Sequence, residues 1–330
     1  MYGQFYTTFR LLKWHIMKIK LDPPIDIERT MNIQIPALEW IKIEERYYRN
    51  VHGRNQCMRA VKGANGARIR ELETENVSGE EMHWTPLLKL TTEDPRIRRL
   101  RDFFTGIYFM NGQDPYRCLI LTLLSQNKTA ERARWTFNAL VENFVDVTPQ
   151  IFSIANARKL TRLLHRCGPH RKANYIIDAS LELMKRWDGD MSWIYDDKDA
   201  ARAALLSLPG VGPKTADCIL LFAGGHDVVP IDTHVERVAR RLGFIEEHAT
   251  RVGIDVHFEK THGSTKAKQL AKEVLESVLE SPGKSHLLLI QHGFEFCHAQ
   301  RPNCLACPIR EECNSTDNRY KTAIRMALGA

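Results

Sequence analysis

LPGVGPKTA, residues 208–216, is the most informative stretch of this sequence. Its two glycines, Gly210 and Gly212, let backbone N–H groups approach a phosphate with no Cβ in the way. Helical spacing of apolar residues on either side predicts short helices over 201–208 and 215–223. The stretch therefore predicts a helix-hairpin-helix unit that holds the backbone of a nucleic acid without reading its sequence.

Two residues near the hairpin suit covalent chemistry. Lys214 lies at the start of the predicted second helix, and Asp232 lies in the segment IDTH at 231–234. The positive end of the helix macrodipole and partial burial both disfavour an ammonium group, so we expect a neutral, nucleophilic amine on Lys214. The carboxylate of Asp232 can stabilise positive charge on a sugar ring as its base departs, or help to deprotonate the lysine.

Both residues also have simpler interpretations. Hairpins of this kind occur in non-catalytic DNA-binding proteins, where a lysine contacts only phosphate. Asp232 can serve as the N-cap of the helix that carries Val235 and Val238. Capping and catalysis are compatible for this carboxylate, and a non-catalytic DNA-binding scaffold is the alternative to an enzyme.

The whole pattern resembles the signature of the helix-hairpin-helix DNA glycosylase superfamily, which includes endonuclease III. The likeness extends over about residues 94–314. It implies that Lys214 corresponds to the lysine that attacks the sugar C1′ in the bifunctional members, and Asp232 to their essential aspartate. It further implies a base excision repair enzyme that removes a damaged base from double-stranded DNA, forms a Schiff base and cleaves the abasic site by β-elimination.

Four cysteines lie close together near the C-terminal end, with the spacing C-x6-C-x2-C-x5-C. They are Cys297, Cys304, Cys307 and Cys313. Four neighbouring thiolates predict a metal centre. Zinc sites usually combine two Cys-x-x-Cys pairs, and disulfide frameworks belong to shorter secreted chains, so both are weaker alternatives. The spacing matches the cluster loop of endonuclease III and its relatives, and the resemblance therefore implies a [4Fe–4S] cluster.

The remaining four cysteines have no paired spacing, and we expect reduced, mostly buried thiols. They are Cys57, Cys118, Cys167 and Cys218. Cys218 lies four residues after Lys214, so both share a helix face and Cys218 is expected to face the base pocket. The string ADCI at 216–219 resembles eukaryotic-type 8-oxoguanine glycosylases, in which a cysteine at this position lines the lesion pocket. Those enzymes lack an iron–sulfur loop, and a small core residue is the alternative for Cys218.

The favoured substrate is an oxidised pyrimidine, with 8-oxoguanine-type and mismatch glycosylases as alternatives. Adenine-mismatch glycosylases share the cluster but need a carboxylate in the helix before their glutamine turn, and residues 119–124 contain none. They also usually lack the lysine, so this alternative is the weaker one.

A polar turn, SQNKT at 125–129, follows a segment that is apolar nearly all round, which is typical of a buried helix. Endonuclease III-like enzymes also place a glutamine here, so Gln126 is the candidate wedge that fills the space left by an extruded base. A helix cap is its alternative role. We expect DNA contacts from a wider set of residues: Lys128, Gly210, Val211, Gly212, Arg301 and Arg310. A second basic cluster either faces DNA or is merely solvated: Arg166, Arg171 and Lys172.

The composition agrees with a DNA partner. The 330 residues include 47 Lys plus Arg against 40 Asp plus Glu, a formal net charge of +7. No apolar run approaches the ~18 residues of a membrane span, and the first residues lack the apolar core of a signal peptide. We expect a monomer located in the cytoplasm with the nucleoid of a prokaryote, or in the nucleus of a eukaryote.

The predicted fold is mainly α, a two-domain helix-hairpin-helix glycosylase fold with a small N-terminal antiparallel β domain. Short alternating runs separated by turn signals predict the β domain, and helical spacing predominates from residue 94 onward. The predicted divisions are an extension (1–31), the β domain (32–92), the glycosylase region (93–316) and a tail (317–330). Within the glycosylase region, 114–231 forms a six-helix domain, and 93–113 plus 232–316 form the cluster domain.

Overall fold

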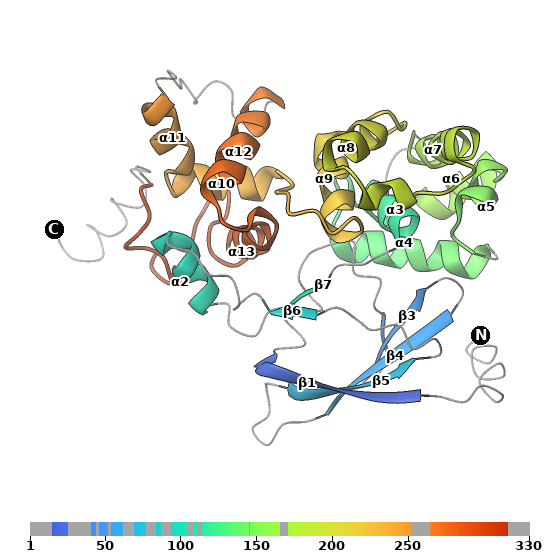
Figure 1. Cartoon of the computed structure of the whole chain (residues 1–330), viewed down its shortest axis with the longest axis horizontal. Helices are drawn as coiled ribbons and strands as arrows, with labels where there is room; N and C mark the ends of the chain where they lie inside the picture. Colours follow the sequence, from blue (N-terminus) through green and yellow to red (C-terminus); the bar gives the residue numbers. More distant parts are fainter. Residues whose placement is uncertain are drawn as a thin grey trace.

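The computed structural model describes most of the chain between residues 15 and 315 (Figure 1). The described residues are 15–25, 41–43, 46–51, 54–61, 69–76, 84–86, 94–103, 108–110, 114–144, 146–165, 171–252 and 265–315. Among them, no helix has both the length and the apolar character needed to cross a membrane.

Helices make up most of the described part and form two lobes that lie side by side (Figure 1). One lobe contains α3 (Pro115–Ser125), α4 (Ala130–Asn143), α5 (Pro149–Ser153), α6 (Ala157–Leu164), α7 (Arg171–Trp187), the 3₁₀ turn η4 (Ser192–Tyr195), α8 (Lys198–Leu206) and α9 (Pro213–Phe222). The other contains α2 (Pro95–Phe103), α10 (Thr233–Arg241), α11 (Phe244–Val252), α12 (Thr265–Val278) and α13 (Pro282–Glu295). The mainly helical fold predicted from the sequence is confirmed.

The strands precede the helices, apart from one. They are β1 (His15–Ile25), β2 (Ile41–Ile43), β3 (Arg46–Val51), β4 (Arg54–Val61), β5 (Ile69–Asn76), β6 (Trp84–Pro86) and β7 (Tyr108–Met110). The first five pair in the order β1-β5-β4-β3-β2, and every pair is antiparallel. Strand β1 begins within the range that the sequence assigns to an extension, and β6 pairs with β7 in a separate two-stranded sheet.

Helix α3 is the centre of the first lobe. Asp114 caps it by accepting a hydrogen bond from the backbone N of Arg117 at 2.8 Å, and Pro115 occupies the first turn. All of its residues from Tyr116 to Leu124 are buried, as their nearly continuous apolar character predicts. The helix packs against α4, α7 and α9, and it ends at the polar turn that faces the hairpin.

The chain enters the second lobe first through α2 and returns to it after α9. Arg96 on α2 donates to both carboxylate oxygens of Glu247 on α11 and to the carbonyl of Leu242, at 2.7 to 3.1 Å. Arg99 lies 3.4 Å from Glu312 in the C-terminal loop. Helix α2 also packs against α13. These contacts place residues 95–103 with the C-terminal helices.

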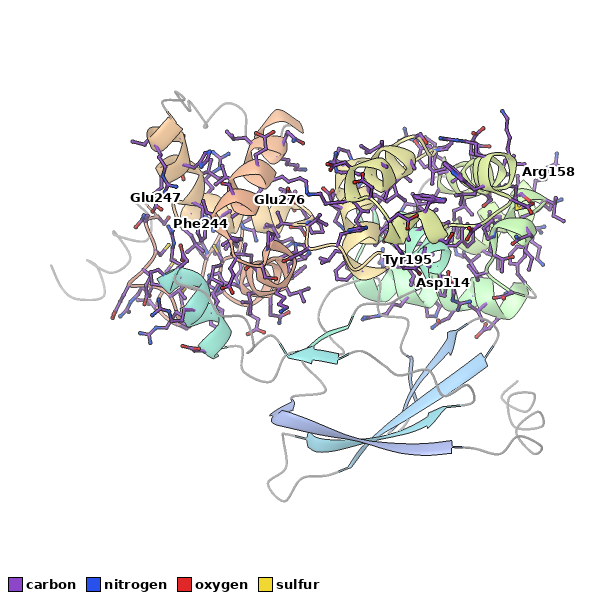
Figure 2. The ribbon with its side chains drawn as sticks, in the orientation of Figure 1. Asp114, Arg158, Tyr195, Phe244, Glu247 and Glu276 are labelled. Carbon is purple, nitrogen blue, oxygen red and sulfur yellow. The ribbon has the colours of Figure 1, made fainter. Side chains whose placement is uncertain are left out.

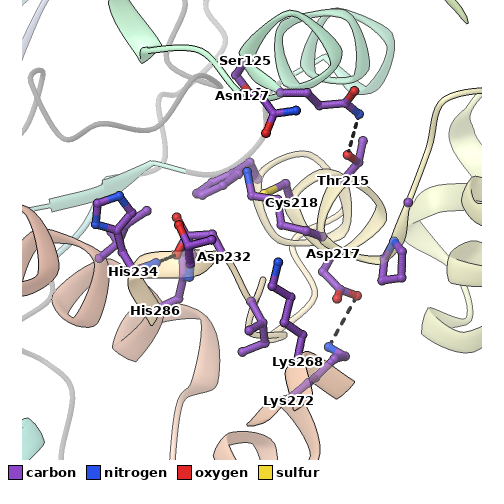
Figure 3. Close-up of a pocket in the computed structure, with 18 of the residues that line it drawn as sticks. Ser125, Asn127, Thr215, Asp217, Cys218, Asp232, His234, Lys268, Lys272 and His286 are labelled. Carbon is purple, nitrogen blue, oxygen red and sulfur yellow. Dashed lines mark hydrogen bonds and ion pairs between the residues drawn. The ribbon is translucent and has the colours of Figure 1, made fainter. Parts of the chain in front are cut away.

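A buried group of charges joins the two lobes. Asp217 on α9 is 1% exposed, and its Oδ1 accepts a hydrogen bond from Nε of Arg202 on α8 at 2.8 Å. The same oxygen lies 3.4 Å from Nζ of Lys272, which belongs to α12 in the other lobe (Figure 3). Lys272 also pairs with Glu276 on its own helix. Because buried charges are stable only when paired, this group fixes α9 against α12.

Candidate active site and cysteine loop

The predicted helix-hairpin-helix unit is formed by α8, the hairpin 208–212 and α9. Gly210 has a φ of +80°, the left-handed region that favours glycine, and the backbone N of Val211 donates to the carbonyl of Leu208 at 3.1 Å. A Cβ on Gly210 would lie 2.6 Å from the ring of Tyr175. Gly212 differs, because a Cβ there would meet nothing within 4 Å. The fold therefore requires glycine at 210 but leaves open space at 212.

This contrast gives a matched pair of substitutions. We expect Gly210→Ala to lower the free energy of unfolding by about 1–3 kcal/mol, because it combines a strained φ with a clash against Tyr175. Gly212→Ala has no clash and should change stability by less than about 1 kcal/mol. Urea unfolding of both variants measures the difference. Equal losses of unfolding free energy in the two variants would contradict the assignment of Gly210 as the strained residue.

A cavity of about 730 Å³ opens where the two lobes meet. Its lining residues come from the turn after α3, the hairpin and α9, the start of α10, and the helices α12 and α13. The residues predicted to act together do meet here: Gln126, Lys128, Gly210, Gly212, Lys214, Cys218 and Asp232. Figure 3 shows the side chains of Cys218 and Asp232 facing this space from α9 and from the start of α10.

Lys214 lies in the first turn of α9, close to Cys218 and Asp232. Burial alone lowers its pKa, but the charge interactions with Cys218 and Asp232 and a hydrogen bond to Cys218 outweigh burial, so the pKa of Lys214 is raised. The direction of this shift is opposite to the one expected from the macrodipole and burial, because that expectation did not include these partners. Burial raises the pKa of the Cys218 thiol. Asp232 adds negative charge beside the Lys214 amine.

Asp232 is the N-cap of α10. One of its carboxylate oxygens accepts hydrogen bonds from the backbone N of His234 and of Val235, each at 2.8 Å. The capping role that the sequence offered is therefore present. The same side chain lines the cavity beside Lys214. A single carboxylate thus fixes the start of a helix and places negative charge in the cavity.

The turn after α3 is tied to the hairpin. The Nε2 amide of Gln126 donates to the carbonyl of Gly210 at 3.0 Å and to Oγ1 of Thr215 at 3.2 Å. Gln126 is also the C-cap residue of α3. Lys128 is exposed at the cavity rim. The wedge role of Gln126 stays a prediction, and it requires these two side-chain hydrogen bonds to be released.

In the second basic cluster, Lys172 is buried and does not face solvent. Lys172 is 5% exposed, and its Nζ donates to the carbonyls of Leu124 and Gln126 at 2.6 and 2.8 Å. It therefore neutralises the C-terminal end of α3, which explains why a lysine is buried there. The interpretation of Lys172 as a DNA contact is corrected. Arg171 is exposed, and Arg166 lies outside the described residues.

The cysteine loop follows α13 and is compact. Its turns are closed by backbone hydrogen bonds from Asn303 to Phe296, and from Cys307, Arg310 and Cys313 to carbonyls three residues earlier. Ile309 anchors the loop in the core with no exposed surface. Arg301 is exposed, and the Arg310 side chain is 41% exposed beside Glu311.

Of the other cysteines, Cys118 and Cys218 are buried free thiols, whereas the side chains of Cys57 and Cys167 lie outside the described set.

The four loop thiols lie close enough together for their charges to act on one another. The charges of Cys297, Cys304 and Cys313 all act on Cys307, whose pKa is raised to about 12, chiefly by burial. Within the described ranges, no three His, Cys, Asp or Glu side chains converge on the position of one metal ion. In a [4Fe–4S] cluster each thiolate binds a different iron, so such convergence is not required. Arg241 donates to Sγ of Cys297 at 3.3 Å, which suits a thiolate.

Several residues that line the cavity were not found from the sequence. Its walls also include Asp217, Lys268, Lys272, His286, Ile290 and Phe294. All but one of these belong to α12 or α13, more than 50 positions after Lys214. The α13 residues of this set are spaced four positions apart, which indicates one helix face. No local motif, however, marks that face as part of the site.

The chain resembles known DNA repair proteins in sequence and structure. Residues 120–262 match the family model described as HhH-GPD superfamily base excision DNA repair protein. Endonuclease III of Sulfolobus acidocaldarius is 29% identical over 214 residues, covering 64% of this chain and 87% of that protein.

Two solved structures extend the comparison. A trapped endonuclease III–DNA covalent intermediate is 26% identical with a TM-score of 0.51, and the match covers 63% of this chain and 87% of that one. The structure of MBOgg1 in complex with a low-affinity DNA ligand is 18% identical and shows a shared fold, with a TM-score of 0.63 over 86% of this chain and 99% of that one. The helix-hairpin-helix unit, the cavity beside Lys214 and these likenesses agree: the chain belongs to the helix-hairpin-helix DNA glycosylase superfamily and is endonuclease III-like.

Proposed function

We propose that the protein is a bifunctional DNA glycosylase and abasic-site lyase of base excision repair, acting as a monomer on double-stranded DNA. The observation that carries this proposal is the meeting of Lys214 and Asp232 in one cavity at the junction of the lobes. A glycosylase that only hydrolyses the base needs the carboxylate but no lysine. An amine and a carboxylate together fit covalent catalysis at a sugar carbon. The solved relative described as a covalent intermediate of endonuclease III supports the same reaction.

The reaction begins with the loss of a proton from the Lys214 ammonium, for which the Asp232 carboxylate is the acceptor beside it. The amine then attacks C1′, and the bond from C1′ to the base breaks with its electron pair leaving on the base. The departing base takes up the proton that Asp232 accepted, so the carboxylate is charged again and stabilises the positive charge that develops on the sugar. Loss of the ring oxygen from C1′ gives a Schiff base, and removal of a C2′ proton expels the 3′ phosphate by β-elimination.

The hairpin is the proposed grip on the DNA backbone. Gly210, Val211 and Gly212 lie directly before the N-terminus of α9, where backbone N–H groups and the helix dipole favour a phosphate. The open space above Gly212 leaves room for close approach. Lys128 and Arg301 are exposed and add positive charge. Extrusion of the damaged base then delivers it to the cavity.

The proposed substrate is an oxidised pyrimidine, in line with the likeness to endonuclease III. An 8-oxoguanine-type activity is the alternative that a specific observation favours, because Cys218 lines the cavity and is hydrogen bonded to Lys214. Helix α3 contains no carboxylate before Gln126, which argues against an adenine-mismatch enzyme. Strands β1 to β5 are proposed to form an N-terminal domain, and the likeness to MBOgg1 over 86% of this chain supports that assignment.

Borohydride trapping tests the proposal. Wild-type protein is mixed with duplex DNA that carries an abasic site, a thymine glycol or an 8-oxoguanine, and the reductant converts any Schiff base into a stable adduct. We expect an adduct on the abasic duplex and on the duplexes whose base is excised. Binding to all duplexes without any adduct would instead show a non-catalytic scaffold.

The four loop cysteines are the proposed ligands of a [4Fe–4S] cluster: Cys297, Cys304, Cys307 and Cys313. Bound through these four side chains, a cluster would tie together the segment of the chain that carries Arg301. Because a lost ligand opens the cluster, we expect Cys304→Ala to lose the brown colour and broad visible absorbance of the purified wild type. Iron and sulfide analysis provides the measurement. Cys118→Ala, which removes a buried thiol outside the loop, should keep the colour, whereas a colourless, zinc-containing wild type would contradict the cluster.

A further inference from the structure

His292 lies in the last turn of α13, where the helix leads into the cysteine loop. The side chain is 2% exposed, and its ring stacks on Phe296 with the ring centroids 5.8 Å apart. Its backbone carbonyl accepts hydrogen bonds from the backbone N of Phe296 and of Cys297, at 3.0 and 2.9 Å. These contacts hold the imidazole at the start of the loop, and it does not line the cavity beside Lys214.

One ring nitrogen of His292 meets a loop thiol. Nε2 lies 3.8 Å from Sγ of Cys307, and hydrogen bonds to sulfur are long because the sulfur atom is large. The backbone N of Ile309 donates to the same sulfur. The other ring nitrogen, Nδ1, is buried and has no hydrogen-bond partner among the described residues. Within that part of the chain, Sγ of Cys307 is therefore the polar partner of this ring.

Packing alone does not explain a histidine at this position. A buried nitrogen without a partner has lost its hydrogen bond to water, so a phenylalanine of similar size is expected to be at least as stable here. What histidine adds is the donor capacity of Nε2. A metal-bound thiolate accepts hydrogen bonds and donates none, so the ring proton lies on Nε2 when Cys307 binds iron.

A hydrogen bond to a cluster thiolate stabilises negative charge on the sulfur. Each electron that a [4Fe–4S] cluster takes up adds negative charge that the iron shares with its ligands. Donors to the sulfurs therefore favour the reduced state and raise the reduction potential. Such donors also orient the ligand and strengthen metal binding. Arg241 is one donor of this kind, at Cys297, and His292 has the position of a second, at Cys307.

We propose that Nε2 of His292 donates a hydrogen bond to the thiolate of Cys307, raises the reduction potential of the bound cluster and slows the loss of its iron. The inference rests on the proposed cluster and goes beyond it, because it assigns a role to a residue that is not a ligand. His292 is a positioning residue for the cofactor and is not catalytic.

The test measures the reduction potential of the cluster by spectroelectrochemical titration of the purified full-length protein. We expect His292→Phe to shift the potential to a more negative value and to transfer iron to a chelator about tenfold faster than wild type. His292→Gln carries an amide N–H that can reach the same sulfur, and it should restore most of the wild-type potential. A purely structural role does not predict this recovery, because glutamine fills the space of the ring less well than phenylalanine does.

A second histidine provides the matched control. His248 on α11 also has a buried Nδ1 without a partner among the described residues, and it directly follows Glu247, which Figure 2 labels. No hydrogen bond joins its ring to a loop cysteine within the described ranges. His248→Phe should therefore keep the wild-type potential.

Each outcome at position 292 decides the role of the residue. A wild-type potential in His292→Phe, or equal shifts in His292→Phe and His292→Gln, overturns the proposal. A cluster that assembles in His292→Gln but not in His292→Phe supports it, whereas failure to assemble in both variants contradicts a hydrogen-bonding role. Wild-type protein without iron and sulfide would refute the proposed cluster itself, which is a different result from brown protein with an unchanged potential.

Discussion

Lys214→Ala is expected to abolish the borohydride-trapped adduct on abasic DNA. The adduct requires a primary amine at the sugar C1′. Alanine has no side-chain amine, so the yield of the adduct should fall by about 10³-fold or more. DNA binding should persist, because the hairpin and exposed cations remain. Adduct yield is read on a denaturing gel, and affinity is read by a mobility-shift titration of the same duplex.

A second lysine in the cavity provides the matched control. Lys268 on α12 lines the same space from the other lobe, and Figure 3 shows it facing the cavity. Lys268→Ala should retain the adduct. If Lys268→Ala lost the adduct and Lys214→Ala kept it, the nucleophile would be Lys268 and the assignment of Lys214 would be wrong.

Asp232→Asn is expected to separate the two roles of this side chain. Asparagine keeps an oxygen that can accept from the backbone N of His234 and Val235, so the free energy of unfolding should change by less than about 1 kcal/mol. The negative charge that stabilises the sugar cation is lost, and base excision should fall by about 10²–10⁴-fold. Single-turnover excision and urea unfolding measure the two effects.

A second capping aspartate controls for the helix effect. Asp114 caps α3 in the same manner but does not line the cavity. Asp114→Asn should therefore leave excision near the wild-type rate. If Asp232→Asn also keeps the wild-type rate, the carboxylate acts only as a cap and its catalytic role is excluded.

Local patterns predicted the parts of the site that lie close together in sequence. The helix-hairpin-helix unit follows from the glycines and proline of residues 208–213, and the capping role of Asp232 follows from residue type and position. The cavity beside Lys214 also contains Cys218, as a shared helix face predicts.

Other features depend on contacts that no local pattern contains. Burial of Lys172 follows from its reach to the end of α3, and the raised pKa of Lys214 follows from Cys218 on its own helix together with Asp232 on another element. His286 enters the site only because α13 packs against α10. The macrodipole and burial alone predict a lowered pKa for Lys214. The pKa is instead raised, because folding brings other charged partners near the amine.

The bond between Asp217 and Lys272 has a consequence for how a damaged base reaches the enzyme. Asp217 lies one turn after Lys214 on α9, and Lys272 belongs to the opposite lobe. Parting the lobes would leave a buried carboxylate without one of its cations, which is strongly unfavourable. The receptor is therefore preorganised, and little ordering of the protein opposes binding. The nucleotide must do the moving, so the ease of extruding each lesion from its duplex becomes the main conformational contribution to selectivity.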